Sequence, residues 1–133
     1  MKVLFAFVCL VVLIQVNSQT DKQKELLAQH YKECLAKSKV NEATLQKARI
    51  GQFADDDKLK EHILCVAQKI GFQNSAGQFQ NQVIETKLRE ALKGDAAKTK
   101  KLISDCAITN PDPKLQAFNA FKCVYQKASI NLL

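Results

Sequence analysis

The chain has 133 residues, of which 47% are hydrophobic and 25% are charged, and its formal net charge is +7. Its longest apolar run, residues 3–14, covers 12 residues, whereas a helix that crosses a bilayer needs about 20. These values argue against a membrane-spanning protein and predict one folded domain.

The N-terminus has the layout of a secretory signal peptide. Lys2 precedes the apolar run, and the small-residue site Val16-Asn17-Ser18 follows it. We therefore predict a signal peptide over residues 1–18 and a secreted, extracellular domain over residues 19–133.

Cysteine usage agrees with an oxidising compartment. Removal of residues 1–18 takes away Lys2, Cys9 and no acidic residue, which leaves a charge of +6. The four remaining cysteines are Cys34, Cys65, Cys106 and Cys123. An even number predicts two disulfides with three possible pairings. No two of the four have the close Cys-x-x-Cys spacing of zinc ligands, so no metal site is expected.

The positive charge is spread along the chain. Lys98, Lys100 and Lys101 are most simply read as a solvated helix face, and no basic motif interleaved with aromatic residues is present. No nucleic-acid partner is therefore predicted.

The predicted fold class is all-α, with about six helices. In the region after residue 18, apolar residues recur at steps of three and four, and the first proline is Pro111. The predicted helices, caps included, cover residues 20–38, 41–51, 55–71, 80–93, 95–108 and 112–128. Residues 72–79 are predicted to form a loop that carries two phenylalanines.

Several helices begin with a recognisable cap. Asn41, Asp95 and Asp112 are predicted N-caps, the last followed by Pro113 at the first helical position. Asp55, Asp56 and Asp57 could together ligate calcium, but the acidic spacing of an EF-hand is missing. Capping of the following helix is the favoured reading of this cluster.

Catalytic machinery is not evident. The chain has two histidines, His30 and His62, and neither stands in a catalytic motif. His62 is expected at a helix surface or boundary. The sequence also lacks a glycine-rich phosphate loop and the motifs of metal hydrolases, so neither an enzyme nor a cofactor is predicted.

The spacing of the four cysteines resembles that of insect odorant-binding proteins. In that family six cysteines pair first with third, second with fifth and fourth with sixth. Cys34, Cys65, Cys106 and Cys123 stand at the spacings of the first, third, fourth and sixth. The second would fall at Glu61 and the fifth at Lys114 or Leu115, so one whole bridge is missing, as in the four-cysteine "minus-C" branch. Residues 57–62, 71–72 and 77–79 also resemble beetle hemolymph and accessory-gland members.

This resemblance implies two bridges, Cys34 with Cys65 and Cys106 with Cys123, and an internal apolar cavity. It also implies a carrier of small hydrophobic ligands such as odorants, pheromones or fatty acids. A membrane receptor as partner, and either a monomer or a weak dimer, remain open. The absent bridge should leave the cavity softer than in six-cysteine members.

The predicted ligand-binding residues are chosen from the apolar stripes, with two tyrosines as polar candidates. They are Tyr31, Ile63, Val66, Phe79, Val83, Leu88, Leu102, Phe118, Phe121 and Tyr125. Each could equally fill a core, because cavities and cores use the same residue types. The apolar tail, residues 129–133, is either a frayed end or a lid over the cavity.

A second hypothesis is a cationic membrane-active or structural secreted protein, motivated by the charge of +6 and the amphipathic helices. A disulfide-tied bundle would keep its apolar faces inside, which argues against it. Liposome binding compared with displacement of a fluorescent ligand would separate the two hypotheses.

Overall fold

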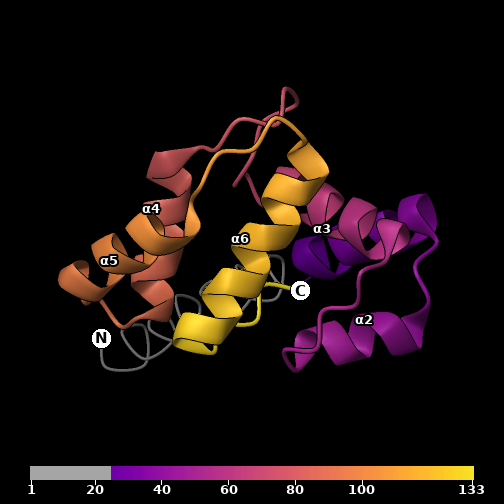
Figure 1. Ribbon diagram of the computed structural model, residues 1–133, viewed down its shortest axis with the longest axis horizontal. Helices are drawn as coiled ribbons and strands as arrows, with labels where there is room; N and C mark the ends of the chain where they lie inside the picture. Colours follow the sequence, from indigo (N-terminus) through magenta and orange to yellow (C-terminus); the bar gives the residue numbers. More distant parts are fainter. Residues whose placement is uncertain (1–24) are drawn as a thin grey trace, which may run out of the picture. The chain divides into compact units, whose positions relative to one another are not determined.

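The computed structural model describes residues 25–133; the predicted signal peptide and the predicted start of the first helix near residue 20 lie outside this range. The chain divides into a stretch that ends at Glu33 and a compact unit of residues 34–133. Helices α2 to α6 all belong to the compact unit. Residues 25–38 are helical. Five further helices follow, α2 (Glu42–Arg49), α3 (Asp57–Lys69), α4 (Asn81–Ala91), α5 (Ala96–Cys106) and α6 (Pro113–Ala128) (Figure 1). The predicted all-α class is confirmed.

The helices begin where the capping residues predict. A side-chain oxygen accepts a hydrogen bond from a free backbone N–H of the first turn at four starts, those capped by Asn41, Asp56, Asp95 and Asp112. Asp56 accepts from the N–H of Lys58 at 2.8 Å, while Asp55 pairs with the ammonium of Lys60 at 2.6 Å. The acidic cluster before α3 therefore caps a helix and neutralises a lysine.

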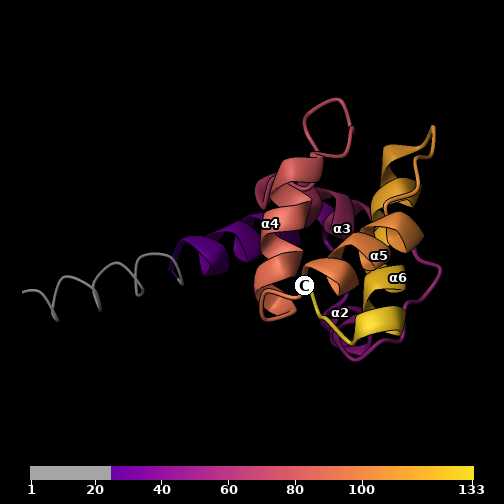
Figure 2. The same cartoon turned by 90° about the vertical axis from the view of Figure 1, so that its left-hand side faces the viewer.

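Helix α6 lies between two neighbours. It contacts α3 on one side and α5 on the other, and α5 in turn contacts α4 (Figures 1 and 2). The side chains that α6 buries include Ala117, Phe118, Phe121 and Val124. These residues recur at steps of three and four and therefore form one broad apolar face, and α6 packs against both α3 and α5.

Two disulfides join the helices. Cys34 bonds to Cys65 of α3 with their Cα atoms 5.6 Å apart, and Cys106 of α5 bonds to Cys123 of α6 with a Cα separation of 5.4 Å. The pairing implied by the resemblance is confirmed. The second bridge fixes α5 against α6.

An ion pair stands where the resemblance places the missing bridge. The ammonium nitrogen of Lys114, at the start of α6, lies 3.5 Å from a carboxylate oxygen of Glu61 on α3. The long side chains of the two residues therefore meet between α3 and α6, which contact each other, and a backbone spacing that suits a bridge stays a prediction. Of the two alternatives for the fifth cysteine position, Lys114 is the one whose side chain reaches Glu61.

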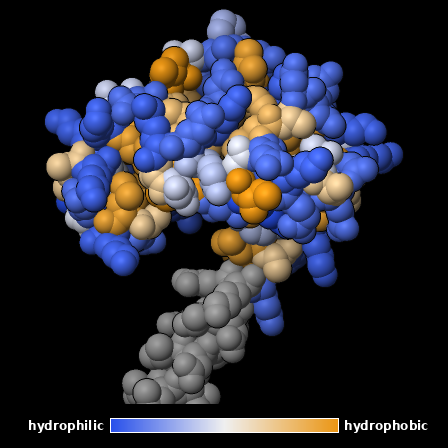
Figure 3. Space-filling view, turned by 60° about the horizontal axis from the view of Figure 1, so that its bottom comes forward, coloured by the Kyte–Doolittle hydropathy of each residue, from blue (hydrophilic) through white to orange (hydrophobic). Residues whose placement is uncertain are grey.

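One face of the molecule carries mostly polar side chains. On the face shown in Figure 3, hydrophilic residues surround separate small hydrophobic spots. Lys98, Lys100 and Lys101 of α5 are exposed, as predicted. Within residues 25–133 no helix is long and apolar enough to cross a membrane.

Candidate ligand pocket

An apolar pocket lies among α4, α5 and α6. The loop between α3 and α4 and the C-terminal tail complete its wall. The lining consists of Phe72, Gln73, Phe79, Ile84, Leu88, Leu102, Ile103, Cys106, Ala107, Ala120, Phe121, Val124 and Leu132. Gln73 is the one polar side chain in this lining, since Cys106 is held in a disulfide. Such a surface suits a ligand that is mostly hydrocarbon.

The pocket is nearly filled by its own lining side chains. It leaves about 20 Å³ for the centre of a water-sized sphere, and a single water molecule needs about 10–15 Å³ by that measure. Sites for small organic ligands typically have volumes of about 300 Å³ or more. Entry of such a ligand therefore requires side chains of the lining, or the tail, to move.

The loop before α4 is held rigidly against the start of α6. Gly77 has a φ of +83°, and a Cβ there would come within 2.6 Å of the Cβ of Pro113, so only glycine fits. The carbonyl of Gly77 accepts hydrogen bonds from the side-chain amides of Gln73, at 3.1 Å, and Gln116, at 2.7 Å. These bonds fix Gln73 between the two phenylalanines of the loop.

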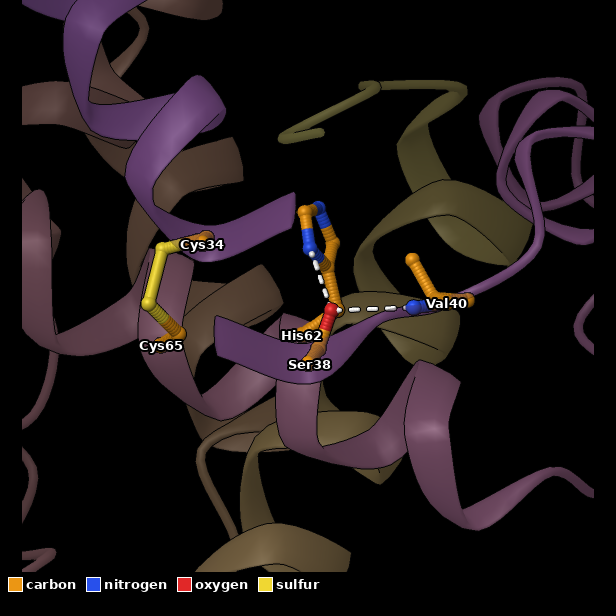
Figure 4. The surroundings of a disulfide bond; sticks show 5 residues. All are labelled: Cys34, Ser38, Val40, His62 and Cys65. Atoms are coloured by element: carbon orange, nitrogen blue, oxygen red, sulfur yellow. Dashed lines mark hydrogen bonds between the residues drawn. A yellow bond between two sulfur atoms is a disulfide. The ribbon is translucent and has the colours of Figure 1, made fainter. Parts of the chain in front are cut away.

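A buried histidine lies on the other side of α6, beside the first disulfide (Figure 4). His62 was expected at a helix surface or boundary, and that expectation is wrong: its side chain is fully buried. Its Nδ1 atom lies 3.3 Å from the hydroxyl oxygen of Ser38, and that oxygen also accepts the N–H of Val40. Burial lowers the pKa of His62, and the charge of Arg49 acts in the same direction. At neutral pH the buried imidazole is therefore in its neutral form.

The compact unit also has wider surface depressions. One of them, about 670 Å³, is open and is bordered by charged side chains that include Lys98, Lys101, Asp105 and Lys127. Charged groups at such a border stay hydrated, and a hydrocarbon ligand cannot be removed from water there. The apolar pocket among α4, α5 and α6 is the better ligand site.

Comparison with known proteins agrees with this architecture. Residues 16–127 match the PBP/GOBP family. The chain belongs to this family. It is also similar to the B2 protein of Tenebrio molitor, with 31% identity over 86% of this chain and 89% of that protein.

Two solved structures in the same range of similarity carry descriptive names. One is the THP12 carrier protein from the yellow mealworm, with 35% identity, a TM-score of 0.61, and coverage of 72% of this chain and 88% of that one. The other is the fatty acid binding protein OBP56a from the oral disk of the blowfly Phormia regina, with 28% identity and a TM-score of 0.61. It matches 79% of this chain and 90% of that one.

In this PBP/GOBP member, four of the ten predicted ligand residues come together in the pocket. Phe79 is in the loop before α4, Leu88 is on α4, Leu102 is on α5 and Phe121 is on α6. Phe72 stands edge-on to Phe121 with ring centroids 6.3 Å apart.

The other predicted residues lie outside the lining. Ile63 and Val66 are buried in the core on α3, and Val83 is half-buried on α4. Phe118 and Tyr125 both stand edge-on to Phe53, at centroid distances of 5.9 and 6.5 Å. Tyr31 belongs to the stretch that ends at Glu33 and stays a prediction.

Sequence reasoning missed the polar residue of the pocket. It proposed Tyr31 and Tyr125 as orienting groups, whereas Gln73 is the polar side chain of the lining. Residues 72–79 were predicted to form a loop that carries two phenylalanines, and the presence of those phenylalanines was the available signal. Nothing in the sequence singles out Gln73, which stands between Phe72 and Asn74.

Proposed function

We propose that this PBP/GOBP member is a secreted, non-enzymatic carrier that binds small hydrophobic ligands in the pocket among α4, α5 and α6. The observation that carries the proposal is an apolar lining with a single polar side chain, Gln73. Removal of a ligand's apolar surface from water contributes roughly 25 cal/mol per Å² of favourable free energy. Two relatives named for carrier and fatty-acid-binding roles support the same conclusion.

Ligand entry is proposed to occur through movement of the tail. Leu132 lines the pocket and Leu133 is 8% exposed, so the end of the chain packs inward. The tail follows Ser129, a non-glycine residue with a φ of +54°, and it belongs to no helix. Displacing a short tail disturbs fewer contacts than separating α5 from α6, which the Cys106–Cys123 bridge opposes.

The test uses two phenylalanines of the same helix. Phe121 and Phe118 are 4% and 7% exposed, but only Phe121 lines the pocket. Phe121→Leu should change the dissociation constant of a fluorescent apolar probe several-fold, because it alters the shape of the site. Phe118→Leu should leave that constant near the wild-type value although it loses comparable core packing. Deletion of residues 129–133 should speed release of the probe in stopped-flow measurements.

The same preparation decides between the carrier and the membrane-active alternative. If the protein is a carrier, alcohols or fatty acids should displace the bound probe, and the protein should not sediment with anionic liposomes. Liposome binding without saturable binding of the probe would overturn the proposal. Equal probe affinities in the two phenylalanine variants would mean that the probe binds outside this pocket.

The remaining parts of the proposal concern the protein's surroundings. Cleavage after Ser18 and export to an extracellular fluid such as sensillar lymph, hemolymph or a gland secretion are checked by N-terminal sequencing of the exported protein. A monomer or weak dimer is expected from sedimentation. A membrane receptor remains a candidate partner of the loaded carrier.

A further inference from the structure

Gln73 has one polar atom without a partner. Its side chain is 2% exposed, and its amide nitrogen donates to the carbonyls of Gly77, at 3.1 Å, and Pro113, at 3.4 Å. Because both neighbours are acceptors, the amide nitrogen must face them, which fixes the oxygen at the opposite position. That oxygen accepts no hydrogen bond from any residue that the structure describes.

A buried acceptor without a donor costs free energy, so an acceptor of this kind in a pocket indicates a position where a ligand can donate a hydrogen bond. Gln73 lines the pocket, and its neighbours in the lining are hydrocarbon. A water molecule needs two to four polar partners and would find one side chain here. A ligand that carries a single donor on an apolar body satisfies both the oxygen and the surrounding wall.

We propose that the side-chain oxygen of Gln73 accepts a hydrogen bond from the ligand, and that the pocket prefers long-chain primary alcohols to ligands without a donor. This inference rests on the proposed carrier function. Ethers of the same size fill the wall but leave the oxygen unsatisfied. An ionised carboxylate only accepts hydrogen bonds, so it would face the Gln73 oxygen with like partial charge.

The acceptor is held in place before a ligand arrives. The backbone N–H of Gln73 donates to the carbonyl of Ala67 at 3.2 Å, and the residue pairs with Phe79 in an isolated antiparallel bridge. Together with its two side-chain bonds, these contacts leave the amide little freedom. Movement of the tail can therefore open the pocket while the acceptor stays fixed, which favours selectivity over simple partitioning.

Gln116 supplies a matched control. Its amide also donates to the carbonyl of Gly77, at 2.7 Å, and the side chain is 4% exposed. Its oxygen, however, accepts the backbone N–H of Asn110 at 2.9 Å, and the residue is not part of the pocket lining. Replacing either glutamine with methionine keeps the chain length and removes one donor to Gly77, but only Gln73→Met removes the acceptor of the pocket.

The experiment measures competition by 1-decanol, methyl nonyl ether and decanoate for a bound fluorescent apolar probe at neutral pH. Wild-type protein and Gln116→Met should bind the alcohol about tenfold more tightly than the ether, the effect of one neutral hydrogen bond. Decanoate should compete least. In Gln73→Met the alcohol and the ether should compete equally. A second measurement on wild-type protein follows the side-chain amide of Gln73 by NMR, which should shift with the alcohol and not with the ether.

The outcomes separate the two proposals. Saturable binding with equal affinity for alcohol and ether in wild-type protein overturns the inference and leaves the carrier function standing. Preference for the alcohol that persists in Gln73→Met, or an unmoved Gln73 amide, overturns it as well. Absence of any saturable binding overturns the carrier function and this inference together.

Discussion

Helix α6 packs against α3 on one side and borders the pocket on the other, and similar residues have different surroundings on the two sides. Toward the loop before α3, Phe118 stands edge-on to Phe53, and the ammonium of Lys60 lies 5.4 Å from its ring centroid. Three residues later, Phe121 stands edge-on to Phe72, and its surroundings include the space of the pocket. One phenylalanine completes a core and the other lines a cavity.

The difference arises from what covers each side. The α3 side is closed by a full stripe of buried residues and by a loop that places Phe53 over α6. The pocket side is covered by two helices of 11 residues, a loop and the tail. A cavity is thus a property of the covering elements, and α6 alone does not specify it.

Removal of each native disulfide should have the largest effect and should separate the two sides. Cys34→Ala with Cys65→Ala opens a loop of 31 residues and should cost about 4 kcal/mol of unfolding free energy. Cys106→Ala with Cys123→Ala opens one of 17 residues and should cost about 3 kcal/mol. Denaturant unfolding measures both.

Ligand affinity should rank the two disulfide variants in the opposite order. Cys106 lines the pocket and its bridge fixes α5 to α6, so its loss should weaken probe binding more than loss of the Cys34–Cys65 bridge. A greater loss of affinity in the Cys34–Cys65 variant would contradict the division between a core side and a pocket side.

A new disulfide between α3 and α6 should have the next largest effect. Glu61→Cys with Lys114→Cys replaces the ion pair at the position of the missing bridge. The variant should oxidise spontaneously and raise the unfolding free energy by up to about 4 kcal/mol, with native strain lowering the gain. Leu115→Cys in place of Lys114→Cys is tested in parallel, because the family's cysteine spacing allows either position and a bridge forms only where the Cβ atoms are close. Failure of both pairs to oxidise would mean that the helices do not meet there.

The buried histidine should make the core side sensitive to pH. Burial lowers the pKa of His62 below 6.5, so the unfolded chain takes up a proton first as the pH falls. The free energy of unfolding should therefore decline from about pH 6.5 down to the pKa of the folded form. His62→Gln should remove this part of the pH dependence in urea unfolding at pH 7.5 and pH 5. An unchanged pH dependence in the variant would show that other groups cause it.

The sequence predicted the ends of the helices better than their faces. Caps such as Asp56 and Asp112 act within a few residues, so local sequence is enough to find them. The position of His62 was missed although Leu59, His62, Ile63 and Val66 share one helical stripe, because its polar type was weighed above its spacing. Phe118 packs in the core and Phe121 lines the pocket because of segments distant in sequence. No local sequence pattern predicts this difference.

The smallest expected effect concerns the ion pair itself. Glu61 and Lys114 are about half exposed, at 50% and 46% of their side-chain areas, so water and salt screen their attraction. A double-mutant cycle with Glu61→Gln and Lys114→Met should give a coupling energy of about 0.2–1 kcal/mol, decreasing in high salt. The pair Lys101–Asp105, also 3.5 Å apart but within α5, is the matched control and should give a coupling of similar size. Similar values would mean that the ion pair does not replace a covalent bridge, and that α3 and α6 are held mainly by apolar packing. A coupling well above that of Lys101–Asp105 would instead make the ion pair a true substitute for the missing disulfide.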